Sequence, residues 1–247
     1  MEVSYFYHLA LVGSWKIVLA HSLSHLRGRK VHIGIVGDLS PAADKVIADI
    51  AASNTVELEI CVTSPDLLAY EIPTLEALQD SKADVVFYSH SKGVSHRHGL
   101  PSKWAEYMYR GCIANESRVL HALASECRTA GVLWTTDLAQ PYRDQSKPVS
   151  YYAGNFWYSR TDYLRTLPRI RQYFRDTYAS SRFTAELWIG HGDPKPLMLD
   201  GRHFTSVSEI WDQIGRSRLP GFDGHGAPNT QGTPRSGTQI FGRLGDD

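Results

Sequence analysis

The chain lacks the features that mark several protein classes. It has only three cysteines, Cys61, Cys112 and Cys127, and no two of them form a CxxC pair. An odd number without paired spacing is neither a disulfide framework nor a zinc-knuckle pattern, and is typical of reduced thiols in a cytoplasmic protein. No apolar run approaches the roughly 18 residues that cross a bilayer, and the N-terminus shows no signal peptide. These absences predict a cytoplasmic protein without an integral membrane segment.

An excess of charge of one sign is also missing. Lys and Arg number 26, as do Asp and Glu, so the formal net charge is zero. Dedicated nucleic-acid binders usually carry a basic excess, so we expect no nucleic-acid partner. The sequence has no GxGxxG fingerprint, no Walker A lysine motif, no GxSxG elbow and no HExxH pair. The absence of these motifs argues against a dinucleotide-binding protein, an NTPase, an esterase or a zincin metalloprotease.

The first 90 residues alternate strand-like and helix-like segments. Strand patterns cover residues 3–11, 30–37, 55–62 and 83–89, and helix patterns cover 15–26, 41–52 and 74–81 between them. Such alternation predicts an α/β fold with a mostly parallel sheet and helices on both faces. Open sheets of this kind bind ligands beyond the carboxyl ends of their strands. The segments that directly follow the strands are therefore the places to look for a site.

The rest of the chain is less regular. We expect a long helix over 103–124, a strand over 131–135, an extended segment over 151–159 and a final helix over 206–216. Ten of the last 28 residues are glycine or proline, and apolar residues there are sparse. This composition predicts one folded domain over residues 1–218 and a disordered tail over residues 219–247.

The first candidate site is the segment SHSKG that ends the predicted strand 83–89. It places His90, Ser91, Lys92 and Gly93 at a carboxyl end. Lysine can neutralise a phosphate, and glycine lets the backbone approach a ligand closely. The alternative is a capped strand end with a solvated lysine.

Two further histidines follow at a short distance. His96 and His98 lie within nine positions of His90, a spacing that could hold a metal ion for a hydrolase. An HxH pair is a weak signal, and a catalytic zinc site needs a third ligand with second-shell support. A solvated loop is the alternative.

Aromatic residues crowd the segment 151–160. Five of them fall within eight positions and surround Asn155. A buried amide needs hydrogen-bond partners, and a sugar or a base could be one of them. The alternative is that the aromatic residues form core.

A lone carboxylate, Glu186, lies among apolar neighbours such as Leu187 and Trp188. Burial raises the pKa of a carboxyl group and can prepare it to act as a general base. The alternative is a structural ion pair with Arg182 or another cation.

In order, these motifs resemble a known family. They are HSKG at 90–93, Trp104, GNFWYSR at 154–160 and RFTAELWIG at 182–190. The same ordered set is typical of small glycosyltransferase-like proteins of bacteria and viruses, which are distantly similar to the rhamnan-synthesis F type of polysaccharide glycosyltransferase. The resemblance covers about residues 3–200.

The resemblance implies a GT-A-like fold and an enzyme of polysaccharide biosynthesis. Such an enzyme moves a sugar from a nucleotide-diphosphosugar to a hydroxyl acceptor on a glycan, a protein or a small molecule. GT-A folds normally hold a divalent cation with a DxD motif, but this chain has Ser-His-Ser there. Our hypothesis is that His90 and Lys92 neutralise part of the leaving diphosphate. A requirement for Mn²⁺ or Mg²⁺ stays open.

The resemblance also implies roles for residues. Glu186 would be the catalytic base, and Gly154, Asn155 and Trp157 would line the pocket, with Trp157 stacking on a sugar. The matching motifs supply the other substrate-binding candidates: Ser91, Gly93, Arg160 and Trp188. A non-catalytic sugar- or nucleotide-binding module on the same fold is the alternative, since missing DxD carboxylates also mark a decayed transferase.

Overall fold

A seven-stranded sheet organises the protein. The computed structural model describes residues 1–92, 103–136, 149–177 and 183–217. The strands of the sheet are β1 (Val3–Ala10), β2 (Lys30–Val36), β3 (Glu57–Ser64), β4 (Val85–His90), β5 (Thr129–Gly131), β8 (Trp157–Arg160) and β9 (Pro196–Met198). Their order is β3-β2-β1-β4-β8-β5-β9. The four strands from β3 to β4 are parallel, and only β8 runs antiparallel to its neighbours. The predicted α/β class with a mostly parallel sheet is confirmed.

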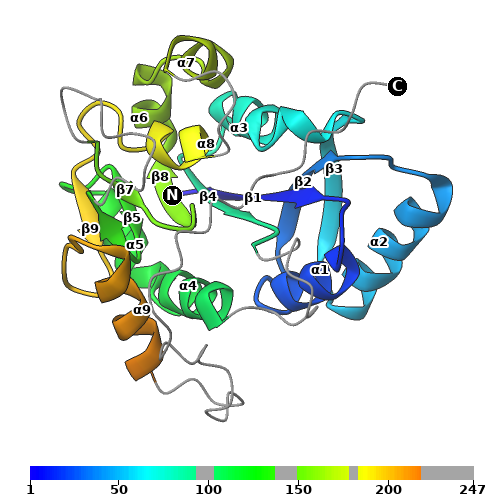
Figure 1. Cartoon of the computed structure of the whole chain (residues 1–247), viewed down its shortest axis with the longest axis horizontal. Coiled ribbons are helices and arrows are strands. Elements are labelled where there is room, and N and C mark those ends of the chain that lie inside the picture. The colour runs from blue at the N-terminus through cyan, green and yellow to red at the C-terminus, as the bar shows by residue number, and fades with distance from the viewer. Residues whose placement is uncertain (93–102, 137–148, 178–182, 218–247) are drawn as a thin grey trace, which may run out of the picture.

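Helices cover both faces of this sheet (Figure 1). One face packs α1 (Trp15–Ser24), α2 (Pro41–Ser53), α4 (Lys103–Ile113), α5 (Glu116–Leu123) and α9 (Val207–Arg216). The other packs α3 (Ile72–Gln79), α6 (Thr161–Thr166), α7 (Ile170–Thr177) and α8 (Phe183–Trp188). Side chains alternate along each strand, so Tyr5 and Tyr7 of β1 enter the first core and Phe6 enters the second.

Two predicted elements are broken by single residues. The expected helix over 103–124 is two helices, α4 and α5, and Asn115 lies between them. Its side-chain amide donates to the Gly111 carbonyl at 2.8 Å, which satisfies an acceptor at the end of α4. The expected strand over 131–135 is interrupted after Gly131, where β5 ends, and Leu133 in the break has a φ of 61°. The chain then enters a separate two-stranded sheet of β6 (Trp134–Thr135) and β7 (Tyr151–Tyr152).

Two further predictions concern the C-terminal tail and a membrane-spanning segment. The tail predicted over 219–247 lies outside the described residues. Among the residues that are described, no helix has the length and apolar character to cross a membrane.

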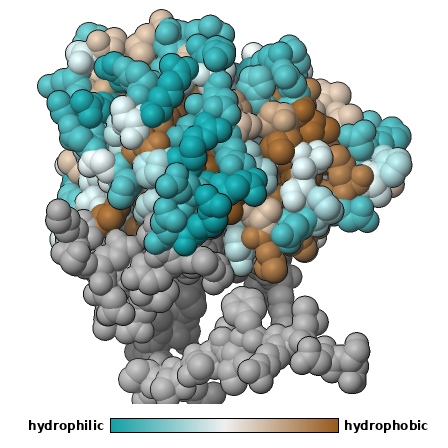
Figure 2. Space-filling view, turned by 90° about the horizontal axis from the view of Figure 1, so that it is seen from above, coloured by the Kyte–Doolittle hydropathy of each residue, from teal (hydrophilic) through white to brown (hydrophobic). Residues whose placement is uncertain are grey.

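The edge strand β3 leaves one side of the sheet open. Figure 2 shows hydrophobic residues gathered toward the end of the molecule where β2, β3 and α2 lie. Exposed apolar side chains in this part of the chain include Ile60 on β3 and Leu68 in the short helix η1 (Leu67–Ala69). Charged side chains also line the edge, where Lys30 lies 2.8 Å from Glu59. Charges along an edge strand oppose pairing with another sheet edge.

Close packing between the sheet and α3 leads to a testable prediction at one glycine. A Cβ on Gly34 of β2 would lie 2.1 Å from Oγ1 of the buried Thr74 in α3. We therefore expect Gly34→Ala to lower the free energy of unfolding by about 1–3 kcal/mol, as overpacking does. Urea denaturation would measure this. Gly215→Ala in α9 is the control, because its added methyl group meets nothing within 4 Å. Equal stability of the two variants would contradict the prediction.

Candidate functional site

Polar residues gather at the carboxyl edge of three neighbouring parallel strands. His90 ends β4, and in the strand register it lies beside His8 of β1. His8 in turn lies beside Gly34 of β2. The sequence predicted a ligand site at this edge, and the contacts below show how the side chains there are held.

A buried carboxylate lies at the centre of the cluster. Glu71 precedes α3, is 7% exposed, and its Oε1 lies 3.1 Å from Nδ1 of His90. The Tyr88 hydroxyl and the Asn155 side-chain amide both donate to its Oε2 at 2.6 Å. Burial alone would raise the pKa of Glu71, but the charge and the hydrogen bond of His90 lower it to about 2. The carboxylate is therefore ionised at neutral pH.

Both ring nitrogens of His90 face acceptors. Nδ1 faces the Glu71 carboxylate, and Nε2 lies 2.9 Å from the carbonyl oxygen of Gly154. A neutral imidazole has only one N–H, so both contacts are hydrogen bonds only when the ring carries two protons. The two contacts of the largely buried His90 join α3, β4 and the turn at Gly154.

The turn between β7 and β8 has an unusual backbone. Gly154 and Asn155 have φ values of 90° and 58°, and a Cβ on Gly154 would lie 2.8 Å from Nε1 of Trp104. The buried Asn155 donates to Glu71 and accepts from Nε1 of Trp157 at 2.6 Å. Asn155 thus finds its hydrogen-bond partners within the protein. Position 154 requires glycine because its φ is positive and because Trp104 leaves no room for a side chain.

Glu186 and Lys92 complete the group. Oε2 of Glu186, in α8, accepts from the backbone N–H of Gly154 at 3.2 Å. Nζ of Lys92 lies 3.9 Å from Oε1 of Glu186 and 5.3 Å from the ring centroid of Trp104. The side chains of Glu186 and Lys92 are 12% and 27% exposed. A partly open carboxylate beside a cation can exchange a proton with a bound hydroxyl group.

Trp104, whose ring faces Lys92, forms an aromatic pair with the exposed Trp211. Trp104 lies near the start of α4, and Trp211 lies on α9. Their rings meet edge to face, with centroids 4.8 Å apart and planes at 89°. Trp211 is 53% exposed. An exposed indole of this kind offers an apolar face to a ligand.

Of the candidates named from the sequence, the structure brings His90, Lys92, Gly154, Asn155 and Glu186 together. Three other candidates, Ser91, Trp157 and Trp188, are buried in the protein interior. Trp157 and Trp188 are both fully buried, so neither ring face is open for stacking on a sugar.

The hydrogen bonds of two of these candidates are internal. Trp188 donates from Nε1 to the Pro168 carbonyl at 2.9 Å. The hydroxyl of the buried Ser91 accepts from the backbone N–H of Ala10 at 3.1 Å. Both side chains hold neighbouring segments in place.

Arg160 is placed away from this cluster. It pairs with Val85 at the start of β4, whereas His90 is the last residue of that strand. Five strand residues separate the two positions by roughly 16 Å. Arg160 instead binds Asp162 on the surface.

The loop candidates Gly93, His96 and His98, and Arg182 beside the last motif, lie outside the described residues. His90 engages both ring nitrogens with Glu71 and Gly154, so a metal ion could bind it only by displacing one of them.

Three participants were not predicted as site residues from the sequence. Glu71 precedes α3, where Pro73 signals only that a helix begins. Trp211 belongs to the predicted final helix over 206–216, which carries no site motif. His8 is a single histidine within the predicted strand over 3–11, and no motif assigns it to a site.

His8 is a buried histidine whose surroundings change its pKa. It is 3% exposed, and its Nδ1 lies 2.9 Å from Oγ1 of Thr74. Burial lowers the pKa of His8 from 6.5 to about 4, although the charge of Glu71 opposes this. The ring is therefore neutral in the folded protein at neutral pH.

This histidine makes stability depend on pH. Between the two pKa values the unfolded chain binds the extra proton, so acidification favours unfolding. We expect His8 to remove about 2 kcal/mol of stability between pH 7 and pH 5. His8→Asn keeps a polar atom near Thr74, and its stability should fall less over that range, whatever its stability at pH 7. Urea unfolding of both proteins at both pH values measures the difference, and parallel declines would contradict it.

Comparison with known proteins gives one family and several distant structures. The model of a family described as a domain of unknown function (DUF8361) matches residues 19–191. Among curated proteins, none is significantly similar to the chain. The resemblance to rhamnan-synthesis F enzymes stays a prediction, because the description of the matching family does not mention it.

Three solved structures illustrate the distant likeness. S. aureus TarS 1-349 has a TM-score of 0.42 and 11% identity, over 87% of this chain and 64% of that one. HddC from Yersinia pseudotuberculosis has a TM-score of 0.42 and 9% identity, over 87% and 98%. The glycosyltransferase GlyE in Streptococcus pneumoniae TIGR4 has a TM-score of 0.41 and 9% identity, over 87% and 47%. The chain thus spans less than two thirds of the TarS and GlyE chains.

Proposed function

Since the chain belongs to the DUF8361 family, whose description assigns no activity, we propose its function from the site. The protein is a glycosyltransferase of GT-A-like fold that moves a sugar from a nucleotide-diphosphosugar to a hydroxyl acceptor. One observation carries the proposal. The partly open carboxylate of Glu186 lies 3.9 Å from Lys92 at the carboxyl edge of the parallel strands, where such folds bind ligands.

Glu186 and Lys92 divide the chemistry between them. The acceptor oxygen attacks the anomeric carbon, and its proton passes to the Glu186 carboxylate. The bond between the anomeric carbon and the diphosphate oxygen breaks, and Lys92 stabilises the charge that develops on the leaving group. Because Lys92 and Glu186 are paired, the substrates enter by separating them.

His90 takes a different part from the one the sequence predicted. Its two nitrogens bind Glu71 and Gly154, so it does not face a diphosphate without breaking one of these contacts. We assign it a positioning role. It holds the Gly154 turn, whose N–H orients Glu186.

The residues at the end of β4 do not fit the divalent cation that a DxD motif holds. Ser89 accepts from the Tyr109 hydroxyl at 3.3 Å, and Ser91 accepts from a backbone N–H. The nearby Glu71 carboxylate is buried and accepts hydrogen bonds from two residues besides its contact with His90. We derive no step through a metal ion, and expect transfer to persist in EDTA.

We assign the aromatic pair of Trp104 and Trp211 to the acceptor site. The Trp104 ring lies beside Lys92 and meets the ring of Trp211. Trp211 is exposed, so its ring can stack on an apolar sugar face. This assignment replaces the stacking proposed for Trp157, which is buried.

Removing the exposed ring tests the acceptor site. We expect Trp211→Ala to raise the KM for the acceptor about tenfold, the equivalent of about 1.4 kcal/mol, and to leave the donor KM unchanged. Steady-state kinetics with each substrate varied in turn measures both. Val207→Ala, an exposed apolar side chain on the same helix, is the control. An unchanged acceptor KM in Trp211→Ala would remove the ring from the site.

The function itself is tested with a panel of UDP-, GDP-, dTDP- and CMP-sugars. A ligand at 100 times its Kd adds about 2.7 kcal/mol of stability, which a thermal shift detects. We expect one class of sugar nucleotide to stabilise the chain, with and without EDTA, and to release its nucleotide when an acceptor is added. The absence of any shift would contradict a nucleotide-sugar enzyme.

A non-catalytic sugar- or nucleotide-binding module is the second candidate. It is favoured by the contacts of Glu186, which already binds both Lys92 and the Gly154 N–H. Such a module would be stabilised by a sugar nucleotide but would release no nucleotide with any acceptor. Turnover therefore separates the two candidates.

A further inference from the structure

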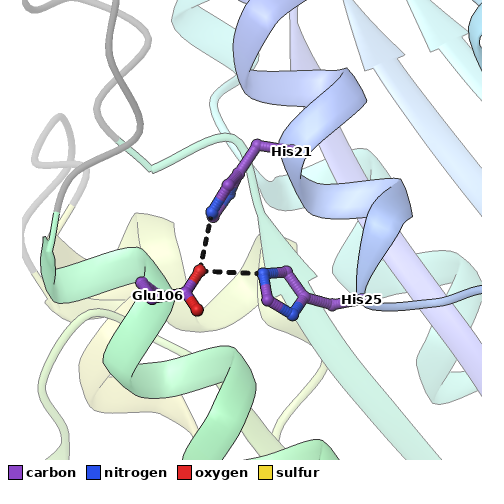
Figure 3. A group of neighbouring side chains, drawn as sticks. All are labelled: His21, His25 and Glu106. Atoms are coloured by element: carbon purple, nitrogen blue, oxygen red, sulfur yellow. Dashed lines mark hydrogen bonds and ion pairs between the residues drawn. The ribbon is translucent and has the colours of Figure 1, made fainter. Parts of the chain in front are cut away.

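A second group of convergent side chains lies between α1 and α4. His21 of α1, His25 just after it and Glu106 of α4 point toward one another (Figure 3). The two histidines are four residues apart, which places them on one side of the helix. Nε2 of His21 and Nε2 of His25 lie 2.9 Å and 3.0 Å from the same Oε2 of Glu106. The three candidate ligand atoms all lie within 4.8 Å of one another.

We propose that His21, His25 and Glu106 bind a divalent transition-metal ion, with Zn²⁺ as the best fit. Two imidazole nitrogens and one carboxylate oxygen form a three-ligand zinc set that leaves a fourth position for water. Imidazole ligands favour Zn²⁺ over Mg²⁺ or Ca²⁺. This site is independent of the proposed glycosyl transfer, whose residues lie elsewhere.

The distances are close to those that a bound ion requires. Zinc bonds of about 2.0–2.2 Å in a tetrahedral site place the ligand atoms roughly 3.4 Å apart. The two nitrogen–oxygen distances of 2.9 Å and 3.0 Å need to open by only a few tenths of an ångström. Each imidazole would then carry its proton on Nδ1 and present the lone pair of Nε2 to the ion.

Neighbouring residues hold the three ligands in place. The His25 ring stacks on Tyr109, with centroids 4.8 Å apart and planes at 6°, and His21 meets the same ring edge-on at 6.2 Å. Arg110 binds Oε1 of Glu106 and leaves Oε2 to the histidines. Carboxylate ligands are commonly held by such a second hydrogen bond.

The charges near the site permit a cation. Arg110 is the one positive group among the described residues that contacts Glu106 besides the two histidines, and its side chain is 44% exposed. It can therefore turn toward water when an ion binds. The side chains of His21, His25 and Glu106 are 17%, 19% and 8% exposed, so an ion can enter from solvent.

A bound ion would fasten α1 to α4. Without an ion, α1 and α4 are linked here by the ring contacts with Tyr109 and by two hydrogen bonds to one carboxylate oxygen. Metal–ligand bonds would replace these hydrogen bonds and would stabilise the folded state, since the unfolded chain holds no such site.

The test uses the full chain, stripped with EDTA and then titrated with Zn²⁺ against a chromophoric chelator. We expect one Zn²⁺ per chain and a rise in Tm of roughly 5 °C or more at saturating metal. The double variant His21→Ala/His25→Ala should lose more than about 100-fold in affinity, together with the rise in Tm. His32→Ala removes another histidine near a carboxylate, Glu59, and should bind as the unaltered chain does.

Two further measurements keep the result decisive if the double variant folds poorly. Glu106→Gln removes one ligand and keeps the side-chain shape, and it should also weaken Zn²⁺ binding. Co²⁺ added to the unaltered chain should give the visible absorption of a four-coordinate site. Failure of the unaltered chain to bind Zn²⁺, or equal binding by all variants, would show that the three residues are only a hydrogen-bonded cluster.

Discussion

Glu186→Gln should lose nearly all glycosyl transfer. The amide keeps an oxygen that accepts the Gly154 N–H but cannot take a proton from the acceptor. General base catalysis contributes about 10²–10⁴-fold, so we expect kcat to fall by that factor. The donor should still stabilise the variant in a thermal shift. Initial rates with the donor that the panel identifies would measure the loss.

A matched substitution separates loss of the base from loss of the fold. Glu209 is a partly exposed carboxylate on α9, held by Thr205, and Glu209→Gln should keep normal rates. Near-normal transfer by Glu186→Gln would remove Glu186 as the base. Loss of donor binding together with rate would instead assign it to binding.

Glu71→Ala should be the most destabilising single substitution in the site. It leaves the His90 ring and the Asn155 amide without their shared acceptor in a buried place. Each buried polar group left without its partner costs about 1–3 kcal/mol, so the loss of both contacts should cost about 2–6 kcal/mol. Urea unfolding at pH 7 would measure the fall in the free energy of unfolding.

A glutamate within α3, the helix that Glu71 precedes, gives the control. Glu76 pairs with Arg171 at the surface, and exposed pairs contribute about 0–1 kcal/mol. Glu76→Ala should therefore unfold close to the unaltered chain. Equal losses in the two variants would show that the Glu71 contacts stabilise no more than a surface pair.

The sheet could be predicted because three of its parallel strands, β1, β2 and β4, are largely buried on both faces. Such strands are short apolar runs, as over 30–37, and the turns between them are clearly marked. The same pattern identified His90 and Lys92, since a strand end is readable in the local sequence. The helix over 103–124 was wrong because its apolar period continues across Asn115, whose side-chain contact no periodicity reveals.

The errors in the site come from tertiary arrangement. Arg160 follows Gly154 by six residues, but β8 is antiparallel and carries it to the far end of β4. Glu71 lies 19 residues before His90 in another element, and no local pattern connects the two. Trp157 looked like a platform because it is aromatic, yet a strand in the middle of the sheet is covered on both sides.

The last two elements set a limit on how far the chain can be shortened. The family match ends at residue 191, but β9 pairs with β5 beyond that point. Phe204, Ile210 and Ile214 then enter the first core. A chain cut at residue 191 would keep Glu186 and Lys92 but would uncover β5 and the core beside it. The shortest piece that keeps this fold therefore has to reach the end of α9.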